Sequence, residues 1–553
     1  MPRERSEWLI EKTEAIADHG MVTADQPLAA RAGLDALRAG GNAVDAAVTA
    51  AFAMGVVEPF TSGVGGVAVA VIRTADGHTA VIDGSTTAPL GAREDMFRAA
   101  ASGTAGMYGW PATVGNENNV GPRSVGVPGM VGAMALALER HGTFSLRHAI
   151  EPALALARDG FEIDYFLALA TSACADRLWP NAEAKRVFFK EGGLPYRSAL
   201  GLESGDRVIQ SDLARTLETI ADGGPQAFYR GPIADAIVED ARALGGILTR
   251  EDFAEFEPRE LAPLTSDYRG WTLVTVPETS GGITVIEALN LLEGFRLGEL
   301  EQSGTAELHL IAEASRRAFV DRLTQLADPR HTRVPFERLA SKEYAEELRR
   351  SIDPAHAGAA TVAAGADAAH TTHICAIDAR RTMVSLTTTL GQGYGSGVVP
   401  RGTGIVLADV MTWFDPVPGR ANSIAPGKRI LWAPSPVLAL RGGRPAFAVG
   451  APGGRKLITS VLQTIVNLID HADGPQAAVN RPRVHCEGRQ TLIDARVRED
   501  VRHELAAMGH ELVVREETIG SGWFGRPNAI AVDAQGMLRA GVNRLKPSIA
   551  MGH

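Results

Sequence analysis

Cysteine is scarce in this chain, with only Cys174, Cys375 and Cys486 among 553 residues. Their odd number and wide spacing exclude a disulfide framework and provide no paired metal-ligand spacing. We therefore expect no metal and no cofactor, and a reducing compartment fits best. Residues 1–20 carry charges throughout and lack the apolar run of a secretory signal, so the sequence predicts a cytoplasmic protein.

Long apolar runs and an excess of basic charge are also missing. The longest apolar stretch, residues 43–60, is interrupted by Asp45 and Glu58 and is rich in alanine, which predicts a buried helix and not a membrane span. The net charge is −10 and the sequence has no basic stripe, so neither nucleic acid nor an anionic membrane is an expected partner. A small-molecule ligand is the remaining expectation.

The patterns that are present indicate a mixed α and β chain. Amphipathic or apolar segments that end at glycine predict helices over residues 27–41, 129–142 and 283–295. The C-terminal third is rich in short β-prone segments separated by turn residues, which is typical of an antiparallel sheet. These segments are residues 373–378, 382–390, 404–410, 436–440 and 446–450.

Residues 351–370 are mostly small, as in a linker between domains, and they end at Thr371. The next two β-prone segments are joined by three residues, 379–381, a common hairpin length. This hairpin would bring Thr371 directly opposite Thr389. A loop longer or shorter by one residue would place Thr388 there instead.

Two facing threonines at the end of a linker suggest either an ordinary strand start or a catalytic centre. A threonine hydroxyl needs a neighbouring base to become a nucleophile, and the α-amino group of an N-terminal threonine can be that base. Its pKa of about 7.7 to 8.0 leaves an appreciable neutral fraction at working pH. Thr371 would gain such an amine only if the His370–Thr371 bond were cut.

Long collinear motifs resemble those of the γ-glutamyltransferases, N-terminal-nucleophile hydrolases that cut themselves before a Thr-Thr-His sequence. They include "VTADQPLAARAGLDALRAGGNAVDAAV", "TSGGIT", "TTHICAID", "GKRILWAPSPV" and "GAPGGRKLITSVLQ". The resemblance implies an α+β fold, a four-layer αββα sandwich. It also implies a large subunit of residues 1–370 associated with a small subunit of residues 371–553.

The same resemblance assigns catalytic roles. It implies that Thr371 is the nucleophile, that Thr389 is its hydroxyl partner, and that the amides of Gly453 and Gly454 form the oxyanion hole. The Gly-Gly pair is also suited to this on physical grounds, because adjacent N–H groups without side chains let a tetrahedral intermediate approach closely.

The departures from the family fall on residues that hold the γ-glutamyl group. Ser85 stands where the family has an arginine for the α-carboxylate, and Trp413 where it has an aspartate for the α-amino group. Val410 replaces a glutamine, Gly391 an asparagine, and Trp432 and Ala433 a pair of serines. Arg455, next to the Gly-Gly pair, could meet a single substrate carboxylate or could be an ordinary surface residue.

Three hypotheses follow. A zwitterion is costly to bury without partners for its charges, so the sequence favours an acylase for a small acyl amide of the glutaryl type, with water or an amine as acceptor. The alternative is a true γ-glutamyltransferase or glutathione hydrolase whose headgroup is held by other residues. The third is a non-catalytic binding protein on the same fold.

Overall fold

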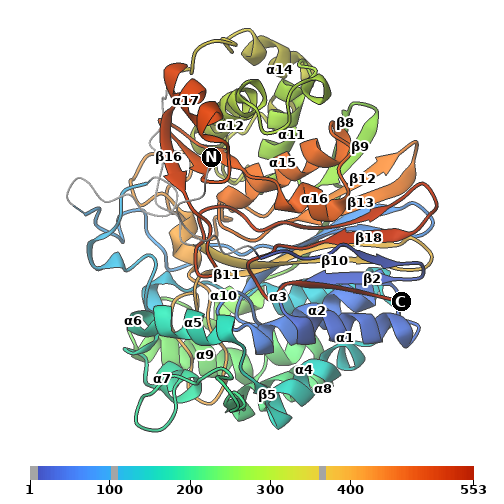
Figure 1. The fold of residues 1–553 in the computed structure, drawn as a ribbon. Coiled ribbons are helices and arrows are strands. Elements are labelled where there is room, and N and C mark those ends of the chain that lie inside the picture. Colours follow the sequence, from blue (N-terminus) through green and yellow to red (C-terminus); the bar gives the residue numbers. More distant parts are fainter. Residues whose placement is uncertain (1–9, 101–109, 360–368) are drawn as a thin grey trace.

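A computed structural model describes residues 10–100, 110–359 and 369–553 of the chain. Its centre consists of two seven-stranded antiparallel sheets that pack face to face (Figure 1). The first sheet, in spatial order, contains β19 (Ile549–Gly552), β2 (Met21–Ala24), β10 (Ala369–Ile377), β11 (Met383–Gln392), β3 (Val67–Arg73), β4 (Thr79–Gly84) and β7 (Arg259–Leu261). The second contains β1 (Ala15–Ala17), β18 (Leu538–Gly541), β17 (Asn528–Val532), β13 (Arg444–Gly450), β12 (Val437–Arg441), β9 (Trp271–Thr275) and β8 (Leu264–Tyr268).

Helices cover the outer face of each sheet (Figure 1). The β10–β11 sheet is covered by α1 (Pro27–Arg38), α2 (Ala43–Val57) and α3 (Met130–His141), with α4 (Leu146–Asp159) and α8 (Ser211–Tyr229) outside them. The other sheet is covered by α11 (Gly282–Leu292), α15 (Lys456–Ile469) and α16 (Pro475–Asn480), with α12 (Thr305–Gln325) and α14 (Lys342–Arg349) beyond. The four layers are those of the αββα sandwich, which confirms the predicted fold class.

The helix α2 supports the hairpin formed by β10 and β11. All of its residues are buried, which explains why its sequence is apolar on every side. Asn42 caps its first turn in a reciprocal capping box with Asp45. Because α2 packs against both strands of the hairpin, it supports them from the outer face of their sheet.

The predicted helices are confirmed as α1, α3 and α11, and the apolar stretch at residues 43–60 as α2. The expected strand at residues 404–410 is wrong. There the backbone is buried and bonds to loops, with Leu407 N donating to Val398 O and Ala408 N to Gly65 O, before a 3₁₀ turn at Val410–Trp413. None of the described helices is both long and apolar enough to cross a membrane.

Candidate active site

The hairpin has the register that its loop length predicted. Ile374 pairs with Leu386 and Thr371 with Thr389. Between His370 and Thr371 the pairing shifts, because His370 faces Gly391 and leaves Leu390 as an extra residue. A β-bulge therefore lies at the His370–Thr371 peptide bond, and bulges of this kind commonly re-aim side chains beside active sites.

A short chain of hydrogen bonds connects the two threonines to this peptide bond. The hydroxyl of Thr389 donates to the carbonyl oxygen of His370 at 2.9 Å and accepts from the amide of Gly391 at 2.9 Å. Thr371 Oγ1 lies 3.0 Å from Thr389 Oγ1. Since the single proton of the Thr389 hydroxyl is used on His370, Thr371 is the donor in this contact. Thr389 thus polarises the carbonyl while it orients the Thr371 hydroxyl.

The surroundings of the threonines are buried and carry positive charge. Thr371 and Thr389 are 4% and 3% exposed. Burial, followed by the cations Lys546, Arg526, Arg177 and Lys456, lowers the pKa of His370 to about 3, so its imidazole is neutral. His373 contacts Thr387 at 2.9 Å, and burial lowers its pKa to about 3 as well, which indicates a packing role.

The Gly-Gly turn precedes α15 and approaches the same site. Gly453 has φ of +131° and Gly454 φ of +60°, conformations that glycine adopts readily. A Cβ on Gly453 would lie 2.7 Å from Gly525 Cα, so a larger residue would displace the neighbouring loop. Gly453 and Thr371 line one cavity, an arrangement compatible with the expected oxyanion hole.

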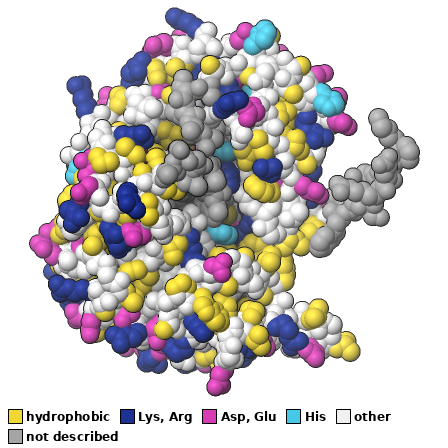
Figure 2. All heavy atoms as spheres, turned by 90° about the vertical axis from the view of Figure 1, so that its left-hand side faces the viewer, with side chains coloured by type: hydrophobic (Ala, Val, Ile, Leu, Met, Phe, Trp, Pro, Cys, Tyr) yellow, Lys and Arg dark blue, Asp and Glu magenta, His cyan; other side chains and the backbone are white. Residues whose placement is uncertain are grey.

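That cavity has a volume of about 530 Å³. One wall is apolar and comes from α5 (Tyr165–Ala173), with Phe166, Leu169 and Ala170. Another part of the lining is the segment 518–526, which we call the 518–526 loop. His370, Thr371, Arg526 and Lys546 also line it. Figure 2 shows this side of the molecule hollowed near its centre, with Lys, Arg and His side chains inside the hollow.

The residues expected to bind the acyl group do not line this cavity. These are Ser85, Gly391, Val410, Trp413, Trp432 and Ala433. The side chains of Trp413 and Trp432 are only 3% and 1% exposed, so they fill space in the interior and form no open wall. Trp413 Cζ2 would lie 3.4 Å from a Cβ on Gly391, which places its ring close to the threonines.

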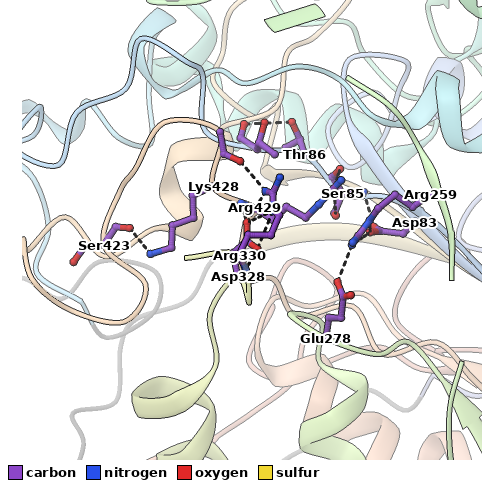
Figure 3. A network of polar contacts seen from close by, with 12 residues as sticks. Asp83, Ser85, Thr86, Arg259, Glu278, Asp328, Arg330, Ser423, Lys428 and Arg429 are labelled. Carbon is purple, nitrogen blue, oxygen red and sulfur yellow. Dashed lines mark hydrogen bonds and ion pairs between the residues drawn. The ribbon is translucent and has the colours of Figure 1, made fainter. Parts of the chain in front are cut away.

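Ser85 lies in a polar network beside another arginine (Figure 3). Arg429 Nη1 donates to Ser85 O at 3.3 Å and to its hydroxyl at 3.4 Å. Nearby, Arg259 pairs with Asp83 at 2.6 Å. The position therefore lacks the family's arginine, yet a guanidinium from a different segment lies next to it.

Arg455 is neither a surface residue nor directed into the cavity. Its guanidinium is 1% exposed and forms two contacts with Glu487, at 2.8 and 2.7 Å. Burial alone would raise the pKa of Glu487, but Arg455 and His485 lower it to about 2. Arg455 consequently serves an internal ion pair, and its expected contact with a substrate carboxylate is corrected.

Two features of the site escaped the sequence analysis. Asp409 is fully buried, with Oδ1 accepting from Gln392 N at 3.1 Å, and burial raises its pKa to about 7. Arg526 and its loop form a wall of the cavity. The glycine-rich, aromatic stretch "GSGWFGRP" at residues 520–527 was the available signal for that loop.

One buried cluster has the side chains of a metal site, namely His309, Glu313 and His510. Its donors are already engaged: Glu313 pairs with both Arg316 and Arg317, and His309 Nδ1 lies 2.8 Å from His510 Nε2. Two guanidinium groups on the carboxylate oppose a bound cation, so these residues are better suited to linking α12 with the C-terminal segment.

Comparisons with known proteins identify the family of the chain. The family model described as Gamma-glutamyltranspeptidase matches residues 29–552. The chain is 38% identical over 536 residues to the acylase ACY 1 proenzyme of Pseudomonas sp. (strain V22), covering 96% of this chain and 93% of that protein. It is 33% identical over 519 residues to the glutathione hydrolase proenzyme of Escherichia coli (strain K12), covering 90% and 87%.

A solved structure extends the likeness to three dimensions. The cephalosporin acylase from Bacillus halodurans matches with a TM-score of 0.87 at 29% identity, covering 100% of this chain and 99% of that one. The chain therefore belongs to the γ-glutamyltranspeptidase family and is an enzyme of the N-terminal-nucleophile amidohydrolase class.

Proposed function

We propose that the chain cuts its own His370–Thr371 bond and that Thr371 then serves as the nucleophile of an acylase for small acidic acyl amides, such as glutaryl amides. The observation that carries this proposal is the hydrogen bond from Thr389 to the carbonyl of His370. A peptide carbonyl polarised by a hydroxyl, with a second hydroxyl aligned beside it, is prepared for internal attack.

Self-cleavage needs no partner other than water. Thr371 Oγ1 attacks the carbonyl carbon of His370 and its proton passes through Thr389 to the departing nitrogen. The peptide C–N bond breaks, leaving an ester between His370 and the Thr371 hydroxyl. Water hydrolyses that ester, giving a carboxylate at His370 and a free amine on Thr371.

The same atoms support turnover. The new α-amine takes the hydroxyl proton of Thr371, and Oγ1 attacks the substrate amide to form a tetrahedral oxyanion. The amides of Gly453 and Gly454 would stabilise that charge, a contribution often worth about 100-fold or more in rate. The α-ammonium gives that proton to the leaving nitrogen, so the C–N bond breaks and the amine product departs with an acyl ester left on Thr371. Water or a second amine then releases the acyl group.

The acyl preference rests on charges that are missing. Trp413, Trp432 and Ala433 occupy positions where the family holds the γ-glutamyl headgroup with an aspartate and two serines. They offer no cation for a carboxylate and no anion for an α-amino group. A glutaryl group lacks the α-amino group, so it avoids the cost of burying an unpaired ammonium ion. Similarity to a protein named acylase points the same way.

Gel electrophoresis and N-terminal sequencing test the cleavage. The purified protein should give two associated fragments, residues 1–370 and 371–553, and the smaller should begin Thr-Thr-His-Ile. Thr371→Ala should stay uncut and inactive, whereas Thr371→Ser should still be cut, because serine keeps the hydroxyl. A fully active protein that remains one chain would overturn the nucleophile assignment.

Glutathione hydrolysis is the second candidate, and the similarity to proteins named glutathione hydrolase proenzyme favours it. Values of kcat/KM for γ-glutamyl and glutaryl p-nitroanilides separate the two, because these substrates differ only in the α-amino group. A tenfold preference for γ-glutamyl would replace our proposal with this one. Uncut, inactive protein would support the third possibility, a binding protein.

A further inference from the structure

Arg526 is a buried cation that has no partner in the part of the chain that the structure describes. Its side chain belongs to a residue only 7% exposed, and none of the described residues forms a hydrogen bond or ion pair with its guanidinium. Its Cζ lies 5.6 Å from the centre of the Phe166 ring, and the carboxylates of Glu517, Asp25 and Glu58 favour its charged form only from beyond ion-pair distance. A desolvated guanidinium with so little compensation is unfavourable, which suggests that a ligand completes it.

The backbone places this cation beside the reaction centre. Arg526 N donates to Pro452 O at 2.9 Å, so the residue is anchored to the turn that contains Gly453. Gly525 packs against Gly453, and Lys456 Nζ donates to Gly522 O at 3.0 Å. The 518–526 loop is thus fixed to the start of α15, and Arg526 lines the same cavity as Thr371.

The second cation of the cavity is already neutralised. Lys546 Nζ contacts Asp25 at 3.2 Å and Glu58 at 3.5 Å. It lies 5.3 Å from the Phe166 ring, on the same aromatic side chain that Arg526 approaches. Lys546 therefore offers no free charge, and Arg526 is the group left to pair with an incoming anion.

We propose that Arg526 binds the free carboxylate of the acyl group, so that the cavity between α5 and the 518–526 loop is the acyl-binding pocket. This inference rests on the proposed function, since it needs Thr371 as nucleophile. A guanidinium matches a carboxylate with two parallel hydrogen bonds, and the apolar wall around Phe166 suits a short methylene chain. The ligand class is the amide of a dicarboxylic acid, held at its distal carboxylate.

Kinetics on a matched substrate pair test the assignment. Glutaryl p-nitroanilide carries the distal carboxylate, and its carboxamide analogue replaces that group with a neutral one of similar size. Arg526→Gln should lower kcat/KM for the glutaryl substrate on the order of 100-fold while the carboxamide substrate changes little. Arg526→Lys, which keeps the charge but loses the two-pronged geometry, should fall between. Equal losses on both substrates would show that Arg526 has a structural role and overturn the proposal.

Arg429→Gln is the control, because Arg429 is also a partly buried arginine but lies at Ser85 and outside the cavity. It should leave the ratio between the two substrates unchanged. If the ratio falls in Arg429→Gln and not in Arg526→Gln, the carboxylate binds near Ser85 and our assignment is wrong. Substrates that carry the carboxylate on the aniline test whether Arg526 binds the leaving group. If Arg526→Gln lowers kcat/KM only for these substrates, Arg526 belongs to the leaving-group site.

Binding to the uncut protein separates this inference from the proposed function. Glutarate should raise the thermal midpoint of Thr371→Ala, and the rise should disappear in Thr371→Ala combined with Arg526→Gln. Equal shifts in both proteins would reject Arg526 as the carboxylate site whatever the state of the nucleophile. If the parent proves uncut and inactive while the Arg526-dependent shift persists, the acylase proposal fails and the anion site stands.

Discussion

Asp409 Oδ1 fills the space that a Cβ on Gly391 would need. The two residues come from different segments. Gly391 N donates to the Thr389 hydroxyl, and Asp409 N donates to the neighbouring Leu390 O. In the family an asparagine side chain stands at the position of Gly391. Here the Asp409 carboxylate occupies the space next to residue 391, which leaves no room for a side chain there.

Gly391→Ala should therefore be strongly destabilising, both because the new Cβ collides with Asp409 and because Gly391 has φ of +96°. We expect a loss of about 2–4 kcal/mol in the free energy of unfolding, and slower self-cleavage. Adding Asp409→Ala should recover the part due to the collision. Urea unfolding of the two single variants and the double variant measures this coupling, and strict additivity would contradict the arrangement.

Asp409→Asn should change how stability depends on pH. Burial, opposed by Arg177 and Gln392 N, raises the pKa of Asp409 to about 7 from its ordinary 3.8. A raised carboxyl pKa favours the protonated form in the folded protein, so its contribution is complete below about pH 4 and is lost as the pH rises through about 7. Asparagine does not ionise. The variant should gain stability relative to the parent between pH 4 and 7, by an order of a few kcal/mol, with no further gain at pH 8.

Unfolding free energies of parent and Asp409→Asn at pH 4.5, 6 and 8 provide the measurement. Asp415→Asn is a useful comparison, because burial also raises the pKa of that aspartate and the variant should gain stability over the parent in the same direction of pH. Parallel stability curves for the parent and Asp409→Asn would show that the Asp409 carboxyl titrates normally.

Thr389→Val keeps the shape of the side chain and removes its hydroxyl. Because this hydroxyl contacts both the His370 carbonyl and Thr371 Oγ1, self-cleavage and turnover should both slow on the order of 100-fold. Pulse labelling followed by gel electrophoresis measures the first rate, and initial rates of matured protein measure the second. Thr389→Ser should retain most of each rate, and a Val variant that matures normally would remove Thr389 from the mechanism.

The Arg455–Glu487 pair should matter for stability and not for acyl preference. Arg455→Met leaves the Glu487 carboxylate buried beside His485 alone, which we expect to cost about 3–5 kcal/mol. Glu487 has a depressed pKa, so the pair stabilises the fold above about pH 4.5 and the effect fades as the pH falls toward 2. Adding Glu487→Leu should restore much of the loss. A changed ratio between charged and neutral acyl substrates in the single variant would return Arg455 to the substrate site.

Much of the fold could be predicted because the local sequence patterns of the helices and of the hairpin match the structures that these segments adopt in the folded protein. The hairpin loop at residues 379–381 fixed the register, and a fixed register places Thr371 opposite Thr389. Residues 404–410 misled because an apolar run buried on all sides looks the same in a central strand and in a buried loop. The bulge at Leu390 was invisible, since it depends on how the chain leaves the sheet.

The hairpin part of the proposed site could be predicted from the sequence, and the proposed acyl-binding part could not. Thr371 and Thr389 belong to one hairpin, so short-range spacing relates them. Arg526 lines the same cavity as Thr371 only because the 518–526 loop packs against the turn at Gly453. That packing has no signature in the local sequence. Trp413 and Trp432 were recognisable as substitutions, but whether a large side chain lines a pocket or fills it depends on neighbours far away in the chain.

The polar network around Ser85 determines what would happen if the family's arginine were restored at residue 85. Arg429 Nη1 lies 3.4 Å from the Ser85 hydroxyl, and Arg259 is already paired with Asp83 (Figure 3). An arginine introduced at residue 85 would meet these like charges, while the carboxylates of this network already pair with other arginines, Asp83 and Glu278 with Arg259 and Asp328 with Arg330. Ser85→Arg should therefore lower the unfolding free energy by about 1–3 kcal/mol, more at low salt, and should not raise activity on γ-glutamyl p-nitroanilide.

Two further variants isolate the cause of that loss. Ser85→Gln adds bulk without charge and should lower the unfolding free energy less than Ser85→Arg does. Ser85→Arg combined with Arg429→Gln should recover the difference, because the repulsion from Arg429 is gone. Urea midpoints at low and high salt and the ratio of kcat/KM for γ-glutamyl to glutaryl p-nitroanilide are the measurements. If Ser85→Arg alone is stable and increases that ratio, then Arg429 does not occupy the position. The lack of an arginine at residue 85 would then account alone for the low activity on γ-glutamyl substrates, and Trp413 would not contribute to it.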